Sequence, residues 1–418
     1  YPEAFFDEKV WTQRRPRPSD DELAAAVAAL RTARKPLIIA GGGVLYSGAT
    51  ETLANFAEAH GIPVAETQAG KSSLPADHPL NMGSIGVTGT SAANELARDA
   101  DVILAVGTRL QDFTTGSWSL FQNGKTIIGL NTQVFDATKH RALPLVADAQ
   151  AGLREIGLQL EALSAPEDWT ERAAEGRNLW FRAADKATAA TNAALPSDGQ
   201  VIGAVQRALG SGATVVCAAG GLPGELHKLW QAGAPGSYHL EYGYSTMGYE
   251  IAGGLGVKMA KPDQEVVVMV GDGSYLMMNS EIATSVMLGL RLTIVVLDNA
   301  GYGCINRLQM ATGGANFNNL LKDARHDVLP SIDFAAHAAS LGAIATKVAS
   351  IAELEAGLAA AVTNDRTTVL VIDTDPLVTT EEGGNWWDVA VPEVSPRPQV
   401  NAARKEYEKA MQAQRVVD

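Results

Sequence analysis

Short, continuous apolar runs alternate with longer amphipathic segments over most of this chain. Near its start, residues 35–43 (KPLIIAGGG) form an apolar run that ends in glycines, and residues 49–61 have the apolar spacing of a helix closed by Gly61. Ser19 and the two aspartates after it are suited to cap the Ala- and Leu-rich helix that opens this block. Continuous apolar strands between amphipathic helices predict a parallel sheet with helices on both faces. The other strands of this block are predicted at 62–67, 101–110 and 125–132, and another helix at 89–100.

The same alternation resumes in the second half of the chain. It therefore predicts a second parallel α/β sheet, so the fold class is α/β with two parallel-sheet domains. The stretch 165–197 between the blocks is Ala-rich and charged, and we interpret it as a connecting helix and loop. The strands of the second block are predicted at 213–220, 265–273, 292–299 and 368–375, and its helices at 199–209, 250–260, 280–290, 333–342 and 351–363.

These blocks give a predicted domain organisation. Residues 1–18 lack Met and are rich in Pro and Arg, which is typical of an interdomain linker. The first α/β domain is expected at 19–164, the connecting helix and loop at 165–197, and the second α/β domain at 198–418, including a C-terminal lid and tail.

Composition and charge narrow the classes of function. The net charge of −14 disfavours nucleic acid and anionic membranes as partners, because both require a basic face. No apolar run reaches the length of a membrane span, and no signal peptide is recognised. The two cysteines, Cys217 and Cys304, lie in or beside apolar runs and are expected to be small core residues. A cytoplasmic protein is the simplest interpretation.

The glycines Gly41 to Gly43 follow a predicted strand and precede a predicted helix. A phosphate-binding loop is conceivable there, but the spacing G-x-G-x-x-G is absent. We therefore expect a structural tight turn. A dinucleotide oxidoreductase also lacks support, since the acidic ribose partner is missing as well.

Oxygen-bearing side chains stand where two neighbouring predicted strands end. Asp272 follows the run EVVVMV, and Asn299 follows the run LTIVVL, one strand–helix–strand crossover later. Ligands of open α/β sheets bind beyond these carboxyl ends. A carboxylate and an amide oxygen suit Mg²⁺ or Ca²⁺, and phosphate oxygens and water usually complete a Mg²⁺ site. The backbone amides of Gly271, Gly273 and Ser274 would suit a phosphate, so the region predicts a diphosphate held through Mg²⁺, although two ordinary strand-end turns remain the alternative.

The motif GDGS…LDNAGYG in this region resembles the signature of thiamine-diphosphate-dependent enzymes of the pyruvate-decarboxylase and acetohydroxyacid-synthase type. The resemblance implies that Asp272, Asn299 and the carbonyl of Gly301 bind Mg²⁺. The family usually has two asparagines here, and Asp298 stands in place of the first. It also implies a fold of three α/β domains, of which the two blocks match the middle domain and the C-terminal, diphosphate-binding domain.

The same resemblance assigns the rest of the cofactor site. The segment YGYSTMGYEIAGG is similar to the one that grips the aminopyrimidine ring, where Met247 would wedge the cofactor into a bent shape and the carbonyl of Ser245 would accept a hydrogen bond from its amino group. For Met247 alone, plain core packing is the alternative. Candidate contacts to the diphosphate are Gly221, Leu222, Pro223 and His227. For His227 alone, a surface position with satisfied hydrogen bonds is the alternative.

Within the family, the segments 64–90, 106–121, 219–230 and 386–395 resemble hydrolases that open a cyclic 1,2-diketone in inositol catabolism. This implies that the cofactor attacks one carbonyl, that water adds to the neighbouring carbonyl, and that the carbon–carbon bond between them breaks. The base that activates the water is not identified. Residues 381–389 (EEGGNWWDV) are a candidate lid, although Trp386 and Trp387 suit a core or an interface equally well.

The family's N-terminal, pyrimidine-binding domain has no counterpart in these 418 residues, nor does the glutamate that activates the cofactor. We therefore expect the chain to be a fragment that is inactive alone and binds cofactor weakly. Alternatives are an acetohydroxyacid-synthase-like carboligase, which would carry a flavin, and a non-catalytic scaffold that retains the fold. The resemblance also implies a homodimer or homotetramer, because family active sites form between subunits.

Overall fold

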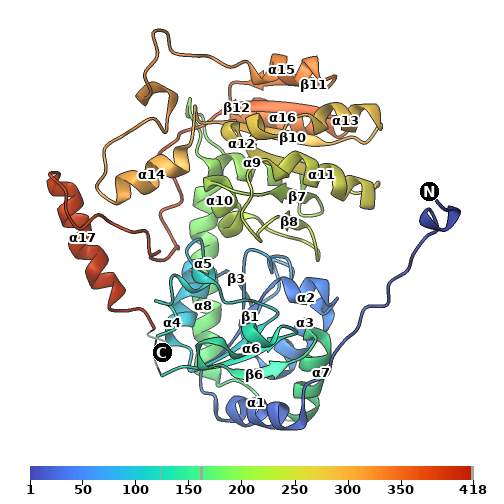
Figure 1. Ribbon diagram of the computed structural model, residues 1–418, viewed down its shortest axis with the longest axis vertical. Coiled ribbons are helices and arrows are strands. Elements are labelled where there is room, and N and C mark those ends of the chain that lie inside the picture. The colour runs from blue at the N-terminus through green and yellow to red at the C-terminus, as the bar shows by residue number, and fades with distance from the viewer. Residues whose placement is uncertain (123, 161–162, 416–418) are drawn as a thin grey trace.

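The computed structural model describes residues 1–122, 124–160 and 163–415, and within them the chain forms two six-stranded sheets (Figure 1). Every strand pair in both sheets is parallel, and helices cover both faces. The predicted fold class is therefore confirmed.

The first sheet has the strand order β3-β2-β1-β4-β5-β6. Its central strands β1 and β4 are buried along their whole length, as their continuous apolar runs predict. The strands are β1 Pro36–Ala40, β2 Val64–Glu66, β3 Asn81–Ser84, β4 Val102–Val106, β5 Thr126–Asn131 and β6 Leu143–Val146.

The second sheet has the order β11-β12-β10-β9-β7-β8. Alternate residues of β9 enter two different cores: Val267 and Met269 pack on one face of the sheet, and Val266 and Val268 on the other. The strands are β7 Thr214–Cys217, β8 Tyr238–Leu240, β9 Val266–Gly271, β10 Thr293–Asp298, β11 Ile344–Val348 and β12 Thr368–Asp373.

The helices begin and end largely where the sequence places caps. Ser19 caps α1 through a capping box with Glu22, and Gly61 ends α3 in the left-handed conformation at φ 60°. The helices of the first half are α1 Asp20–Thr32, α2 Gly42–Tyr46, α3 Thr50–His60, α4 Ser91–Asp99, α5 Asp112–Thr115, α6 Val134–Thr138 and α7 Ala149–Gln159. Those of the second half are α9 Asp198–Leu209, α10 Gly221–Leu229, α11 Tyr249–Ala260, α12 Asp272–Met277, α13 Glu281–Met287, α14 Gly303–Ala311, α15 Phe334–Ser340, α16 Ile351–Ala361 and α17 Pro398–Met411. Three 3₁₀ turns, η1 Glu3–Phe5, η2 Lys139–Arg141 and η3 Leu321–Asp323, complete the described elements.

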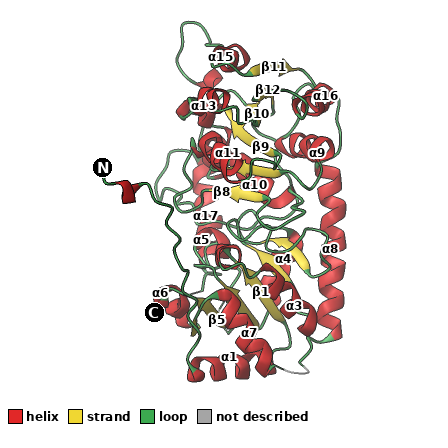
Figure 2. Cartoon of the chain, turned by 90° about the vertical axis from the view of Figure 1, so that its right-hand side faces the viewer, coloured by secondary structure: helices red, strands yellow, loops and turns green. Residues whose placement is uncertain are grey.

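The long helix α8, Glu167–Ala187, lies in the predicted connecting stretch. Figure 2 shows it running along one side of both halves. It contacts α4 and β3 of the first half and α9 of the second. Among all described helices, none combines the length and the apolar character needed to cross a membrane.

Four strands of the structure, β3, β6, β8 and β11, are absent from the prediction. All four are sheet edges, and β6 also contains Pro144, so none presents a long run of apolar residues. The predicted turn at Gly41 to Gly43 also differs in detail, because Gly42 already begins the short helix α2. Glycine is required there because a Cβ on Gly41 would lie 2.4 Å from the carbonyl oxygen of Gly107.

The segment 376–389, here called the C-terminal strap, ties the second half to the first. The amide of Gly384 donates to the carbonyl of Gly89 (2.7 Å), and that of Asn385 donates to the carbonyl of Val87 (3.1 Å). The Asn385 side chain accepts from Arg98 and donates to Ser119 Oγ (2.7 Å). With this many anchors, the predicted lid is part of a fixed connection between the halves.

The strap makes a measurable contribution to stability. We expect Asn385→Ala to lower the free energy of unfolding by about 1–3 kcal/mol, because two side-chain hydrogen bonds between the halves are lost. Urea unfolding followed by tryptophan fluorescence measures this. Asn401→Ala on the exposed part of α17, where the amide makes one bond to Ser395, is the matched control and should change stability by less than about 0.5 kcal/mol. Equal effects of the two variants would contradict a tethering role.

Candidate functional site: a metal and diphosphate site

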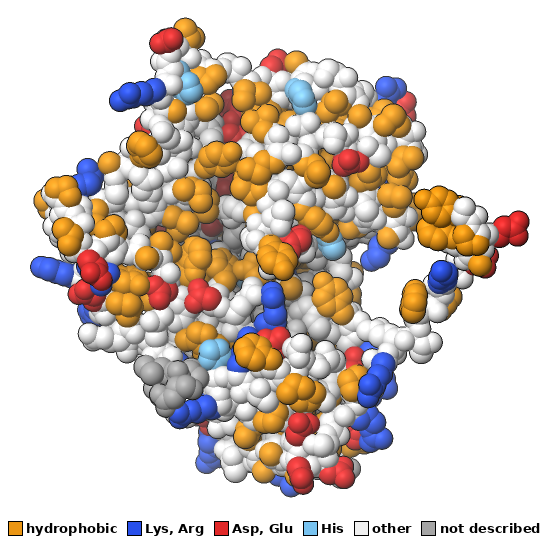
Figure 3. All heavy atoms as spheres, viewed as in Figure 1, with side chains coloured by type: hydrophobic (Ala, Val, Ile, Leu, Met, Phe, Trp, Pro, Cys, Tyr) orange, Lys and Arg blue, Asp and Glu red, His pale blue; other side chains and the backbone are white. Residues whose placement is uncertain are grey.

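The candidate site lies where the connections of the second sheet diverge. From β7 the chain passes to the edge strand β8 on one side, and it then returns to β9 and β10 on the other side. Such a switch point leaves a crevice at the carboxyl ends of the central strands. The turns after β7, β9 and β10 therefore meet there. Figure 3 shows a hollow in the middle of one face of the molecule, between its two halves.

Two buried oxygen atoms in these turns are left without partners. Asp272 Oδ2 accepts a hydrogen bond from the amide of Gly301 (2.7 Å), which brings Asp272 against the turn that carries Asn299. Asp272 Oδ1 and Asn299 Oδ1 are both buried, and neither has a hydrogen-bond partner among the described residues. An unpaired buried oxygen costs free energy that a cation would recover. The residues present therefore fit a hard metal ion.

The turn after β10 has an unusual backbone that presents Gly301. Ala300 has φ 58° and Gly301 φ 140°, and a Cβ on Gly301 would lie 2.5 Å from the carbonyl oxygen of Asn319. The amide of Ala300 donates to Asp298 Oδ1 (3.0 Å), which stabilises the turn. Only glycine fits at position 301, because both the left-handed φ and the close approach of Asn319 exclude a side chain.

The electrostatics of the turns also favour a cation. Burial, and then the negative charge of Asp298, raise the pKa of Asp272 to about 7. Burial raises the pKa of Asp298 as well. The described residues contain no group of three or more His, Cys, Asp or Glu side chains arranged to hold a metal. A metal here would rely on one carboxylate, an amide oxygen and a backbone carbonyl, and on oxygens of a bound phosphate, as Mg²⁺ commonly does.

The backbone around Asp272 passes directly from a strand into a short helix. Gly271 is the last residue of β9 and precedes the first turn of α12. A Cβ on Gly273 would lie 2.7 Å from the ring of Tyr302. The hydroxyl of Ser274 is engaged by protein groups, since it donates to Glu250 Oε1 and accepts from the amide of Gly248. Its contribution to a ligand would therefore come from its backbone.

The helix α10 begins at the end of β7 with Gly221, Leu222 and Pro223, so its N-terminus lies at the same crevice. A helix N-terminus favours an anion. The surface alternative for His227 is wrong, because its side chain is fully buried. Its ring nitrogens contact Thr88 Oγ1 (2.9 Å) and the carbonyl of Glu66 (3.3 Å), both in the first half. Burial lowers its pKa well below the usual value, so the imidazole is neutral and faces the domain boundary.

The segment before α11 forms an open turn beside the crevice. Glu241 accepts hydrogen bonds from the amides of Tyr244 and Thr246 (both 2.9 Å), and Ser245 is exposed with φ 55°. Met247 is half-buried and belongs to none of the three described hydrophobic cores, so core packing does not account for it.

Arg307 is a site residue that sequence reasoning missed. It lies one turn into α14, and a Cβ on Gly221 would be 2.2 Å from its Nη2 atom, so its guanidinium rests on the first residue of α10. Its Nη1 donates to the carbonyl of Pro376 (2.6 Å) in the strap. Burial raises the pKa of Asp198, and the positive charge of Arg307 partly opposes this rise. The only signal for Arg307 in the sequence was a basic residue four positions after Gly303, which ends the turn that follows β10.

A second polar region between the halves is too small to hold a cofactor. It is a cavity of about 20 Å³ lined by Glu66, Lys71, Arg177 and Trp230, which has room for about one water molecule. Glu66 accepts from the amide of Leu74 and from the Asn81 side chain, so its carboxylate is already engaged. Burial raises the pKa of Glu66 and lowers that of Lys71 to about 8.

Comparison with known proteins identifies the family of both halves. Residues 23–156 match the model of the thiamine pyrophosphate enzyme central domain, and residues 218–372 match that of the C-terminal TPP binding domain. The chain belongs to the thiamine pyrophosphate enzyme family.

Relatives with established names include 3D-(3,5/4)-trihydroxycyclohexane-1,2-dione hydrolase from Geobacillus thermodenitrificans, which is 40% identical over 96% of this chain. A protein of the same name, numbered 2, from Bacillus cereus strain ZK is 39% identical over the same share. The chain spans 67% of the length of each of these relatives.

The raised pKa of Asp272 predicts how stability depends on pH. The unfolded carboxyl ionises near 3.8 and the folded one near 7, so folding favours the neutral acid and stability is lost as pH rises between these values. Asp272→Asn is neutral at every pH. At pH 8 without metal we expect this variant to exceed the wild type by about 1–3 kcal/mol, and at pH 3.5 to equal it.

The assignment of Asp272 as a metal ligand also predicts how ligands change stability. Thermal unfolding with and without Mg²⁺ and pyrophosphate measures this. The ligands should raise the midpoint of the wild type and leave that of Asp272→Asn unchanged, because a metal ligand has lost its charge. A wild type that is most stable at pH 8 without metal would contradict the assignment.

Asp298 makes a separate prediction, since it occupies the position where the family usually has asparagine. Asp298→Asn removes the charge that raises the pKa of Asp272, so Asp272 should ionise at lower pH. We expect the pH midpoint for Mg²⁺-dependent pyrophosphate binding to fall by about one unit. Calorimetric titrations from pH 5 to 8 measure it. Asp365→Asn, at an exposed aspartate, should leave the midpoint unchanged, and an equal shift in this variant would refute the local explanation.

Proposed function

We propose that the chain holds thiamine diphosphate through Mg²⁺ and serves a hydrolase that opens trihydroxycyclohexane-1,2-dione to 5-deoxy-glucuronate in myo-inositol catabolism. The observation that supports this cofactor assignment is the pair of buried, unpartnered oxygens on Asp272 and Asn299 at the ends of β9 and β10. The observation that favours this reaction is the similarity, across both sheets, to proteins named for it.

In this proposal Asp272, Asn299 and the carbonyl of Gly301 bind Mg²⁺. The N-terminus of α10 and the guanidinium of Arg307 face the anionic end of the cofactor, because both border the same turns. The positive end of α10 and the amides after β9 replace water around the diphosphate. His227 keeps a structural role at the boundary between the halves.

Met247 and Ser245 would contact the aminopyrimidine half of the cofactor. Met247 is half-buried outside the cores, and an unbranched side chain adapts to the ring it supports. When bound, thiamine diphosphate supplies a nucleophilic carbon and an electron sink. The chain's own residues position it and exclude water from the crevice.

A wall of aromatic residues beside this segment suits a ring substrate. Phe113 packs against Tyr242 (ring centroids 6.0 Å apart) and against Trp387 (5.6 Å). Trp387 Nε1 donates to Asp112 Oδ2 (2.7 Å), which fixes the indole. Three distant parts of the chain therefore meet at Phe113, and one of them is the segment that carries Ser245. Aromatic faces would pack against the C–H groups of a polyhydroxylated ring, and polar groups at their edge would bond its hydroxyls.

The carboligase alternative calls for a flavin on the first half. The strand order of that sheet is one that binds dinucleotides at the β1 and β4 ends. Here the amides of Gly41 and Gly43 already donate to the carbonyls of Val106 (2.8 Å) and Gly107 (2.9 Å), so they offer no N–H groups to a flavin diphosphate. This favours the hydrolase.

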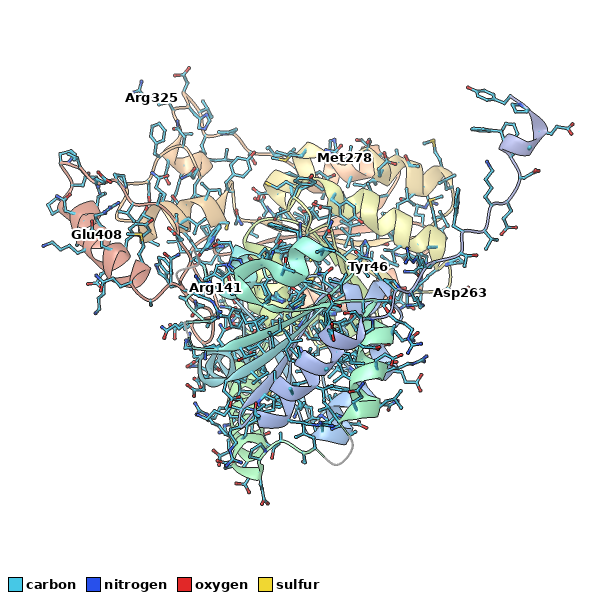
Figure 4. All side chains as sticks on the ribbon, turned by 60° about the horizontal axis from the view of Figure 1, so that its bottom comes forward. Tyr46, Arg141, Asp263, Met278, Arg325 and Glu408 are labelled. Carbon is cyan, nitrogen blue, oxygen red and sulfur yellow. The ribbon has the colours of Figure 1, made fainter. Side chains whose placement is uncertain are left out.

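We also expect association of copies of the chain. Large apolar side chains are exposed near the site, and Figure 4 shows Met278 at the surface beside α11 and α13. A homodimer or homotetramer would cover them. The exposed residues of this region include Tyr244, Leu276, Met277, Met278, Met287 and Leu288.

The test is an assay with trihydroxycyclohexane-1,2-dione, thiamine diphosphate and Mg²⁺, in which NMR detects the ring-opened acid. It uses the 418-residue chain and the same chain extended through the coding sequence upstream of Tyr1. We expect the extended protein to form the acid only with both cofactors, and the chain alone to be inactive. Asn299→Ala should reduce turnover at least about 100-fold, and Asn364→Ala should not. Carboligation of pyruvate with an unchanged diketone would overturn the reaction class, and cofactor binding without either reaction would indicate a scaffold.

A further inference from the structure

A buried carboxylate, that of Glu250, lies where the three turns of the site meet. Glu250 is in the first turn of α11 and is 2% exposed. The carboxylate faces the N-terminal end of its own helix, and backbone N–H groups and a hydroxyl surround it. Burial raises the pKa of Glu250, and the surrounding hydrogen-bond donors oppose that rise because they stabilise a negative charge.

Each oxygen of Glu250 holds a different turn. Oε1 accepts from Ser274 Oγ (2.7 Å) in the turn after β9, and Oε2 accepts from the amide of Gly248 (3.0 Å) in the aminopyrimidine segment. The amide of Gly248 also donates to Ser274 Oγ (2.8 Å), which closes a ring of three hydrogen bonds. The backbone of Ala219, in the turn after β7, lies near the same carboxylate and lowers its pKa.

The backbone around Gly248 shows how closely these parts meet. Gly248 has φ 90°, and a Cβ there would lie 3.3 Å from the Cβ atoms of both Met277 and Met278 at the end of α12. The aminopyrimidine segment and the diphosphate turn are thus pressed together at this point. Glu250 is the side chain that bonds to both of these parts, and the third turn lies near its carboxylate.

We propose that Glu250 is a positioning residue that fixes the register between the diphosphate half and the aminopyrimidine half of the cofactor site before the cofactor binds. It does not contact the cofactor, since both of its oxygens are engaged by the protein. The inference rests on the cofactor site proposed above and is independent of which diketone is the substrate.

Amide hydrogen exchange of the chain without ligand tests the proposal directly. In Glu250→Gln, which keeps the shape and removes the charge, we expect residues 218–221, 246–250 and 272–275 to exchange faster together, by about tenfold. Strands β9 and β10 should keep their protection. The matched control is Glu281→Gln, a first-turn glutamate of α13 whose carboxylate accepts from the neighbouring Ser280, and it should leave all three turns unchanged.

Faster exchange confined to 246–250, or no change at all, would overturn the proposal. Should Glu250→Gln not fold, Ser274→Ala decides the same question. It removes the bond between two of the turns, so exchange should rise at 246–250 and 272–275 and not at 218–221. A rise in all three turns, or in none, would contradict the arrangement.

Binding measurements separate positioning from direct contact. With Mg²⁺ present, Glu250→Gln should weaken thiamine diphosphate about tenfold and pyrophosphate less than about threefold, because only the whole cofactor spans both halves. Arg307→Gln, at a residue that faces the diphosphate, should weaken both ligands alike. Equal losses of both ligands in Glu250→Gln would overturn the role in register. No diketone enters these measurements, so their outcome is independent of the proposed hydrolysis.

Discussion

The organisation of the second half depends on two buried oxygen atoms that the protein itself does not satisfy. Asp272 Oδ1 and Asn299 Oδ1 lie at adjacent strand ends, and the described residues supply no donor for either. Burial and Asp298 oppose ionisation of Asp272, so the site without a cation carries a cost. A divalent ion bound there would offset that cost and would attract an anion. The left-handed backbone of Ala300 and Gly301 brings the turn after β10 against Asp272.

The halves are joined in a way that serves this site. The strap bonds to Arg307 at one end, through Pro376, and to the first half at the other, through Asn385. Between these points Thr380 donates its amide to Glu225 of α10 (3.0 Å). The strap therefore contacts α14 and α10, whose ends border the crevice, and carries Trp387 to the aromatic wall.

Much of the fold was predictable, because β1, β4, β9 and β10 are continuous apolar runs that only a parallel sheet with two covered faces explains. Edge strands such as β3 (NMGS) were not, since their residues are too polar and too few to give a period. Asp272 and Asn299 stood out because strand ends are visible in the sequence. Arg307 and Glu250 did not, because their roles depend on which turns the topology brings together. His227 was a candidate from the sequence, but its full burial at the boundary between the halves was not visible there.

The most direct test of this account is the position of a bound metal. Anomalous diffraction from a crystal grown with Mn²⁺ and pyrophosphate locates the ion. The account predicts one ion bound by Asp272 Oδ1, Asn299 Oδ1 and the carbonyl of Gly301, at about 2.0–2.3 Å from each, with pyrophosphate oxygens completing the shell. An ion held elsewhere, or pyrophosphate bound with Asp272 and Asn299 still unliganded, would contradict it.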